Sequence, residues 1–428
     1  MYLSFGLVFI LPMKAIGPAS WGLFATSQAI LTIIFLVADR FALQIIVNFG
    51  VIEEQRRQAT STAVLLDTLF IGSCTFAIWL GRYDIGAFTA KPELAPVLAL
   101  FPLVACAFWL RNFTLMVAQL HIDTRGRFII DGAWIGATTL LLLHGHYAGW
   151  LVDEIDMMYI TAASAGFSSL VGFLIYSSRI RFALSFPFSL FKRMVRFGVA
   201  QFGSAATTGF LAQGDVVLLA SLVGDAAIVG NYDAAKKFFR GFEGIRDAVV
   251  LFVYPAVARL SAQHRSDELR VLIEKMIAFM AIVIVPIVLL VWILPIDQVF
   301  HWVFKGKYQL APDLFRLLSF AALAIPFSMN NYVLLGMSQV RRLFLATAIT
   351  VAIFVLISLI AVPLLGAKGQ GLALVASFWV LGILSVVMVR KLTGISLRNV
   401  SGRWRDALEF VRALLRRAFG RRTSNHDL

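Results

Sequence analysis

Charged residues interrupt a long apolar stretch of this chain between residues 236 and 247. If the stretch is helical, positions 236, 240, 243 and 247 share one face. Lysine and arginine donate charge-assisted hydrogen bonds, and an arginine binds two phosphate oxygens at once, so such a face suits a pyrophosphate and acidic sugars. The open alternative is that the acids only neutralise the cations in a helix near the membrane interface. The six residues are Lys236, Lys237, Arg240, Glu243, Arg246 and Asp247.

A single carboxylate stands in the apolar run before this stretch. Asp215 lies deep in that run, two residues after Gln213. An unpaired carboxylate there is costly unless it meets a cation or takes up a proton. Asp215 therefore either pairs with Arg240 or Arg246, or serves as a proton or sodium site.

The first half of the chain carries a sparser set of charges in similar positions. Asp39 and Arg40 end one apolar core, Asp67 lies in the next run, and Arg111 and Asp131 stand at the edges of two later runs. Arg111 either faces a cavity or anchors its helix at the basic side of the membrane. The predicted substrate-binding cations are Arg40, Lys236, Lys237, Arg240 and Arg246. The acids predicted to couple an ion or to form a structural pair are Asp39, Asp215 and Asp247.

Amide side chains are candidates for a path that sugars follow. Asn330 and Asn331 come shortly after Pro326, which predicts a kinked helix with amides beside the kink. With Gln213 they form the predicted sugar path. Hydrogen bonding between helices explains the two asparagines equally well.

Long apolar runs must position all of these residues. Of the 428 residues, 60% are hydrophobic and only 14% are charged, so lipid is the main solvent. Runs of roughly 18 to 25 residues, enough to cross about 30 Å of hydrocarbon, lie near 19–38, 62–80, 94–110, 128–148, 157–177, 197–223, 237–257, 276–294, 314–335, 343–365 and 369–389. With Tyr2 to Pro12, interpreted as a truncated first helix, they predict an all-α polytopic membrane protein. It has about 12 transmembrane helices in two six-helix lobes around a central cavity.

Basic residues are concentrated in alternate loops, which predicts the orientation. One side receives pairs such as Arg56 and Arg57, and also the basic tail. By the positive-inside rule that side is cytoplasmic, so both termini are cytoplasmic and the loop with Asp153 and Asp156 faces outward. The net charge of +14 is spread over short loops rather than one patch, so nucleic acid is not an expected partner.

Four segments follow from these patterns. Residues 1–177 are predicted to form the N-terminal six-helix lobe and residues 197–390 the C-terminal one. Between them, residues 178–196 mix arginines with phenylalanines, which is typical of an interfacial linker on anionic lipids. Residues 391–428 form a basic amphipathic tail that is predicted to lie on the cytoplasmic surface.

Signatures of several enzyme classes are missing from the sequence. It has no nucleotide-binding lysine loop, no zinc-binding helix and no nucleophile elbow. His144 and His146 point to different faces of a helix, and Cys74 and Cys106 lie in apolar runs without metal spacing. We therefore predict no catalytic residues, no metal, no cofactor and no enzymatic activity.

A weak internal repeat supports the division into two lobes. Ile16-Gly17-Pro18 followed by Trp21-Gly22-Leu23-Phe24 is similar to Val223-Gly224-Asp225 followed by Val229-Gly230-Asn231-Tyr232. Internal repeats build two lobes around a central site in many transporters. Glycine turns between helices also arise without a repeat.

These turns combine with further motifs into a resemblance that runs nearly the full length. The motifs are Gln213-Gly214-Asp215, Tyr232-Asp233-Ala234-Ala235-Lys236, Tyr254-Pro255, Leu334-Leu335-Gly336-Met337, Pro363-Leu364-Leu365-Gly366 and Gly369-Gln370-Gly371-Leu372-Ala373. In this order they resemble the polysaccharide transport family, the lipid-linked oligosaccharide flippases of the multidrug/oligosaccharidyl-lipid/polysaccharide exporter superfamily. Asp39-Arg40-Phe41 departs from the acidic residue and small, glycine-containing turn expected there.

The resemblance implies a protein of the bacterial inner membrane. It would move an undecaprenyl-pyrophosphate-linked oligosaccharide repeat unit to the periplasmic leaflet for surface polysaccharide biosynthesis, by alternating access of its lobes and without ATP hydrolysis. The implied partners are the lipid-linked glycan, anionic membrane lipids and other polysaccharide-assembly membrane proteins.

Two alternatives stay open at this stage. A multidrug or cation antiporter of the related superfamily branch would show fewer cavity cations and a committed acidic ion site in the first lobe. A membrane-embedded glycan polymerase or transferase would carry a large outer loop with clustered acids or arginines, whereas the longest outer loop, 295–312, holds few charges.

Overall fold

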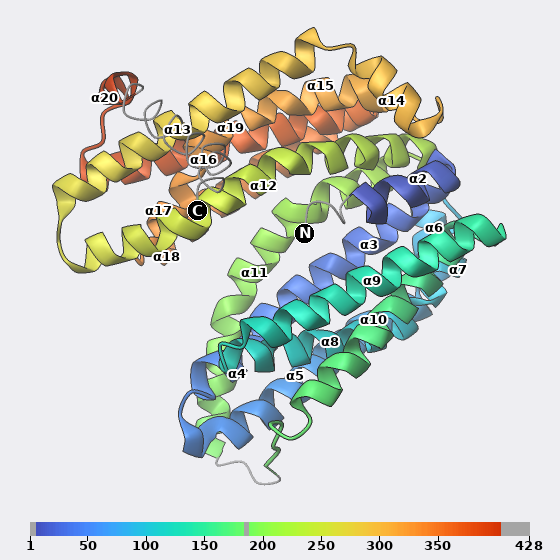
Figure 1. Cartoon of the computed structure of the whole chain (residues 1–428), viewed down its shortest axis with the longest axis horizontal. Helices are drawn as coiled ribbons and strands as arrows, with labels where there is room; N and C mark the ends of the chain where they lie inside the picture. The colour runs from blue at the N-terminus through green and yellow to red at the C-terminus, as the bar shows by residue number, and fades with distance from the viewer. Residues whose placement is uncertain (1–5, 184–187, 404–428) are drawn as a thin grey trace, which may run out of the picture. The chain divides into compact units, whose positions relative to one another are not determined.

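The structure is a computed structural model that describes residues 6–183 and 188–403, and every regular element in these ranges is helical (Figure 1). Nine of the described helices are long and apolar enough to cross a membrane, and a bent helix pair raises the number to ten. The predicted all-α polytopic membrane fold is therefore confirmed. The tail from Trp404 onward lies outside the described residues, so its amphipathic helix stays a prediction.

Short helices alternate with long ones along the chain. The elements before the predicted linker are η1 Gly6–Ile10, α2 Leu11–Ala15, α3 Pro18–Ala38, η2 Asp39–Leu43, α4 Gln44–Phe49, α5 Glu53–Leu80, α6 Arg82–Phe88, α7 Leu94–Ala99, α8 Phe101–Leu120, α9 Thr124–Ala148 and α10 Glu154–Tyr176. Those that follow are α11 Phe188–Leu222, α12 Ala226–Ala262, α13 Ser266–Ile293, α14 Ile296–Phe304, α15 Ala311–Ala322, α16 Ile325–Ser328, α17 Asn330–Gly336, α18 Val340–Leu365, α19 Ala367–Thr393 and α20 Leu397–Gly402.

The chain divides into two compact units. The first comprises residues 1–234, 299–311 and 358–370, and the second comprises residues 235–298, 312–357 and 371–428. This division does not test the predicted six-helix lobes, so the lobes and their bounds remain a prediction.

Several helices depart from the apolar runs. The run near 19–38 belongs to a continuous span, Pro18–Phe49, in which η2 is a π-helical segment. Asp39 and Arg40 therefore lie within a span rather than at its end. Helix α11 begins at Phe188 and so includes part of the predicted linker. Helix α12 covers the run near 237–257 but is not among the candidate spans, because its charges between residues 236 and 247 lower its hydropathy.

The run near 314–335 is broken as its proline predicts. Helix α15 and the segment Ile325–Gly336 meet at an angle of 44°. Pro326 occupies the first turn of α16, where a proline is tolerated because its missing N–H would have no intrahelical partner.

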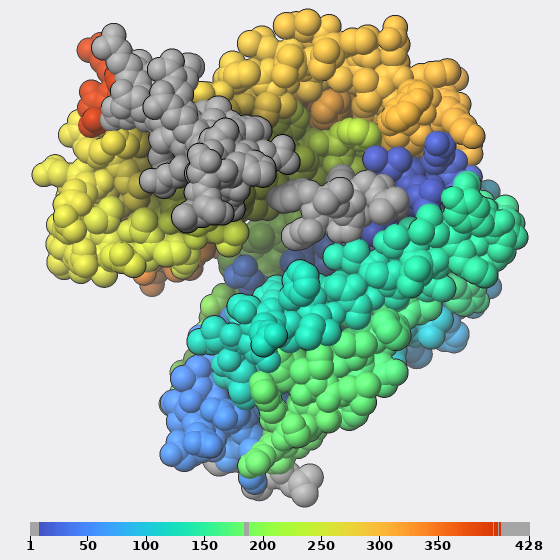
Figure 2. Space-filling model, in the orientation of Figure 1, coloured from blue at the N-terminus to red at the C-terminus, as the bar shows by residue number. Residues whose placement is uncertain are grey.

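Small polar residues bring α10 close to its neighbours in the first unit. The Ser168 hydroxyl donates to the Ile130 carbonyl in α9 at 2.8 Å, and the Ser169 hydroxyl donates to the Ala107 carbonyl in α8 at 2.5 Å. Membrane helices associate through such close contacts because lipid provides no hydrophobic driving force between them. Figure 2 shows α9 and α10 lying side by side on this unit, in teal and green.

Two glycines of the internal repeat meet where α3 crosses the first turns of α12. A Cβ on Gly22 would lie 1.9 Å from the Ala226 carbonyl oxygen, and a Cβ on Gly230 would lie 1.9 Å from the Pro18 oxygen. Each glycine thus faces the carbonyl four residues before the other. Nearby, the Trp21 indole N–H donates to Asp233 Oδ2 at 2.9 Å. The crossing is closed by backbone contact and by a buried hydrogen bond.

Lys91 fixes the end of α11 in the same unit. The side chain is 1% exposed, and its Nζ donates to the Ala220 and Val223 carbonyls, both at 2.5 Å. Ala220 lies in the last turn of α11 and Val223 directly follows it, at the helix end where the macrodipole favours a cation. Burial lowers the pKa of Lys91 from its ordinary value.

Glu274 joins two elements of the second unit. It lies on α13, is 1% exposed, and its Oε1 accepts from the Ser396 N–H at 3.2 Å and from Arg270 Nε at 3.2 Å. Asn399 of α20 donates to the same oxygen at 3.3 Å. These hydrogen bonds hold α20 against α13.

We expect Gly230→Ala to lower the thermal unfolding midpoint, because the added methyl group meets backbone that has no room to move. The expected loss is about 1–3 kcal/mol, typical of overpacking. Intrinsic tryptophan fluorescence of the purified protein during heating measures the midpoint. Gly241→Ala on the same helix is the control, since a Cβ there meets nothing within 4 Å. An unchanged midpoint for Gly230→Ala would contradict the close crossing.

Candidate functional site

A buried carboxylate in α5 is the most isolated charged group of the first unit. The Asp67 side chain is fully buried, and neither of its oxygens has a hydrogen-bond partner among the described residues. Asp39 of η2 is near enough to interact electrostatically with Asp67, Arg40 and Arg111. Apolar side chains of α3, α5 and α8 pack into a buried core that includes Ile34, Ala38, Ala105 and also Ile71, one turn after Asp67 on α5. An ionisable group at such a position marks a functional site by default.

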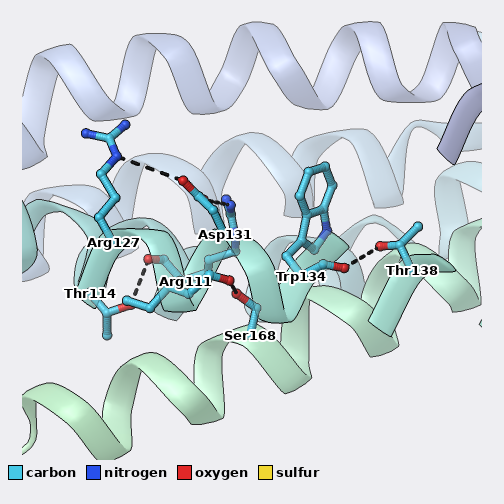
Figure 3. A network of polar contacts seen from close by, with 8 residues as sticks. Arg111, Thr114, Arg127, Asp131, Trp134, Thr138 and Ser168 are labelled. Atoms are coloured by element: carbon cyan, nitrogen blue, oxygen red, sulfur yellow. Dashed lines mark hydrogen bonds and ion pairs between the residues drawn. The ribbon is translucent and has the colours of Figure 1, made fainter. Parts of the chain in front are cut away.

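Arg111 is enclosed by a polar network between α8 and α9 (Figure 3). Its Nη2 lies 2.5 Å from Asp131 Oδ1, and its guanidinium lies 5.0 Å from the centre of the Trp134 ring. The side chain is only 11% exposed. Arg127 approaches the other Asp131 oxygen at 3.9 Å, from one turn away on α9. The sequence left two interpretations of Arg111 open, a cavity residue or an anchor at the membrane surface. The structure shows a third arrangement, in which Arg111 is paired with an acid and joins two helices.

Arg40 lacks such a partner. Its side chain is exposed, and it makes no hydrogen bond or ion pair with any residue that the structure describes. Among the predicted substrate-binding cations, Arg40 belongs to the first unit, and it lies within the span Pro18–Phe49. Its predicted role in binding substrate stays a prediction.

The charged face of α12 divides into paired and unpaired groups. Arg246 contacts Glu243 at 3.4 Å and Asp247 at 3.0 Å, so its charge is balanced within the helix. Lys236 is buried and Lys237 is half-buried, and both make contacts. Arg240 is half-buried and has no hydrogen bond or ion pair among the described residues. Arg240 is therefore the cation of this face that is available to a ligand.

Asp215 has a partner that the sequence did not predict. It is fully buried in α11 and accepts a hydrogen bond from the Tyr232 hydroxyl at 2.8 Å. This bond satisfies one oxygen of the carboxylate and joins α11 to the first turns of α12 within one unit. Whether Asp215 also couples an ion stays a prediction.

The amides of the predicted sugar path lie on separate helices. Gln213 is half-buried on α11. The Asn330 side-chain amide donates to the Phe327 carbonyl in the preceding turn at 2.8 Å. The Oδ1 atoms of Asn330 and Asn331 are buried without a hydrogen-bond partner in the described part of the chain. Their contact with a sugar stays a prediction.

Charged groups held within apolar helices of an all-α fold define a polytopic membrane protein. The family profile described as "Polysaccharide biosynthesis protein" matches residues 15–299, two thirds of the chain. The chain belongs to this family, and the predicted family resemblance is confirmed. A search of curated protein sequences finds no match.

Solved structures of transporters share the fold. A multidrug resistance MATE family transporter of the MOP superfamily, in an inward-facing conformation, is similar with a TM-score of 0.74 and 14% identity, covering 94% of this chain and 95% of that one. The lipid II flippase MurJ, inward closed, gives 0.73 and 12%, covering 97% and 91%. A MOP superfamily transporter from Pyrococcus furiosus gives 0.57 and 15%, covering 94% and 96%. At these identities the likeness establishes the fold.

Sequence reasoning placed Asp67 in a span but did not select it as a site residue. The available signal was an acid near the middle of the apolar run 62–80. The sequence could not show that Asp67 lacks a hydrogen-bond partner, because this depends on which side chains of other helices pack against α5.

Arg111→Gln should destabilise the protein by about 1–2 kcal/mol, the upper range for a polar contact between membrane helices. The change removes the charge that balances Asp131 and the contact with Trp134. Arg127→Gln is the matched control, because this exposed cation forms a weak ion pair. Thermal midpoints that fall equally in both variants would contradict the assignment of Arg111 as the joining cation.

Asp67→Val should raise the thermal midpoint, because it removes a buried polar group without a partner, worth about 1–3 kcal/mol. The same variant should lose transport if the carboxyl serves function rather than folding. Asp84→Val, at an exposed position of α6, should leave both unchanged. A lower midpoint for Asp67→Val would show that the carboxyl stabilises the fold.

Proposed function

We propose that the protein translocates an undecaprenyl-pyrophosphate-linked oligosaccharide repeat unit across the bacterial inner membrane for surface polysaccharide biosynthesis. One observation carries this proposal: in a member of the polysaccharide biosynthesis family, Arg240 on the charged face of α12 has no hydrogen bond or ion pair with any residue that the structure describes. Translocation proceeds by alternating access of two lobes, without catalysis.

The electrostatics of this face favour an anionic substrate. Arg246 is balanced by Glu243 and Asp247, so Arg240 is left to interact with a ligand. A pyrophosphate supplies several oxygens in the geometry that a guanidinium binds. The interaction is strong where water is scarce, because a low dielectric weakens its screening.

Fixed cations also meet the main energetic requirement for moving such a lipid. Each ionised phosphate loses its hydration as it crosses hydrocarbon, and the loss is prohibitive unless fixed donors replace the water. In this proposal Arg240 on the charged face of α12 supplies such a donor, and Arg40 supplies another within the span Pro18–Phe49. The similar fold of a protein named as a lipid II flippase is consistent with a lipid-linked substrate.

The related antiporter function is the second candidate. The buried acid Asp67 favours it, because a carboxyl group without a hydrogen-bond partner among the described residues attracts a cation or a proton, and the half-buried Asp39 lies near enough to interact with it. A multidrug resistance transporter has a comparably similar fold. The proposed flippase instead uses these acids for ion coupling.

The proposed setting follows the charge pattern of the loops. The basic side and both termini are cytoplasmic, anionic lipids contact the basic loops, and other polysaccharide-assembly membrane proteins supply and receive the glycan lipid.

Arg240→Ala should slow translocation by about tenfold or more, the loss expected for one charge-assisted hydrogen bond. In the source organism deleted for the gene and complemented with the variant, mass spectrometry should detect accumulated pyrophosphate-linked oligosaccharide and reduced surface polysaccharide. Arg259→Ala is the control, as an exposed cation of the same helix. Normal export from well-expressed Arg240→Ala protein would exclude Arg240 from the substrate path.

A further inference from the structure

A cavity outside the charged site lies at one end of the first unit. Its volume is about 690 Å³, and it opens where α5 begins and where α8 and α10 end. Four arginines line it, from two segments far apart in the sequence: Arg56, Arg57, Arg179 and Arg181. None of them belongs to the membrane-embedded groups described above.

Two of the four arginines are held in place by the protein. Arg56 Nε donates to the Gly50 carbonyl at 2.9 Å. Arg179 contacts Asp123 at 3.5 Å. The Gly126 backbone N–H keeps the pKa of Asp123 below its usual range, so the carboxylate stays ionised opposite Arg179. The lining is therefore partly rigid.

The segment after α10 is also tied to α5. The Ala183 backbone N–H donates to the Ser61 hydroxyl at 2.8 Å. This hydrogen bond brings Arg179 and Arg181 to the first turns of α5, where Arg56 and Arg57 lie. Arg56 and Arg57 belong to α5, so this hydrogen bond connects the segment that carries Arg179 and Arg181 to the helix that carries the other pair.

The other two arginines are unpaired. Arg57 and Arg181 have no hydrogen bond or ion pair among the described residues. Glu53 and Glu54 are the acids that line the cavity, and neither forms an ion pair in the described part of the chain. His121 also lines it and contacts the Val117 carbonyl through Nδ1, which leaves Nε2 for a ligand. The cavity therefore has an excess of permanent positive charge.

We propose that this cavity binds a phosphate-bearing head group at the membrane surface, through the free guanidiniums of Arg57 and Arg181. Guanidinium groups match phosphate oxygens in pairs, and the ends of membrane helices lie at the depth of lipid head groups. The volume lies within the range of small-molecule sites. The shared chemistry is a phosphoryl group, carried either by an anionic phospholipid or by a pyrophosphate-linked lipid.

A general preference for basic residues at one membrane surface does not explain this arrangement. That preference requires only cations near the helix ends. Here four arginines from two segments line one cavity, and Arg57 and Arg181 have no hydrogen bond or ion pair within residues 6–183 and 188–403. The inference does not depend on which solute the protein moves.

Isothermal titration calorimetry of the full chain in neutral detergent tests the proposal. The probes are inorganic pyrophosphate and short-chain phosphatidylglycerol, with short-chain phosphatidylcholine as the zwitterionic comparison. The R57Q/R181Q variant should weaken binding by about tenfold or more, the loss expected for a charge-assisted hydrogen bond. R125Q/R196Q removes two exposed arginines of the same unit that lie outside the cavity and should bind like the wild type.

Each outcome decides the proposal. Tighter binding of pyrophosphate identifies a pyrophosphate-linked lipid as the source, and tighter binding of phosphatidylglycerol identifies a phospholipid. The proposal is overturned if neither probe binds, if phosphatidylcholine binds as tightly as phosphatidylglycerol, or if R57Q/R181Q binds like the wild type. Equal losses in both double variants would also overturn it, because they would indicate general surface charge. Equal thermal midpoints show that the variants remain folded.

Discussion

The cost of placing a charge in hydrocarbon governs this structure. On insertion scales an acid or a base in the middle of a membrane helix costs about 2.5–3.5 kcal/mol. The chain reduces this cost in different ways at different positions. Arg111 is paired with Asp131, Arg246 with two acids of its own helix, and Asp215 with the Tyr232 hydroxyl. Charges left without such compensation must have another use.

Asp67 and Arg240 are the groups whose cost is least compensated. Asp67 is buried with neither oxygen satisfied among the described residues, and Arg240 has no protein partner there. Their opposite charges suit two roles in transport, because an anionic substrate requires a cation and a driving ion requires an acid. The first unit combines close backbone contact, as at Gly22 and Gly230, with large buried side chains such as Trp21 and Phe101.

Hydropathy and loop charge were sufficient to predict the helical membrane fold, and the motifs were sufficient to predict the family. The sequence also located the charges, but not their partners. Asp215 was expected either to pair with Arg240 or Arg246 or to serve as a proton or sodium site. In the structure it accepts a hydrogen bond from Tyr232, a partner that depends on how the helices rotate against each other. The length of the α3 to α4 span was underestimated, since Asp39 and Arg40 end the apolar run without ending the helix. The arginine cavity joins segments more than 100 residues apart, which no local pattern indicates.

Reconstitution of the purified chain into proteoliposomes tests the central claim most directly. A fluorescent pyrophosphate-linked oligosaccharide lipid is placed in one leaflet, and its accessibility to a membrane-impermeant glycosidase is followed over time. The account predicts that the wild-type protein moves the lipid to the other leaflet, and that Arg240→Ala does so much more slowly. Failure of the wild-type protein to move this lipid, together with ion-driven transport of an organic cation in the same vesicles, would contradict the account and identify an antiporter.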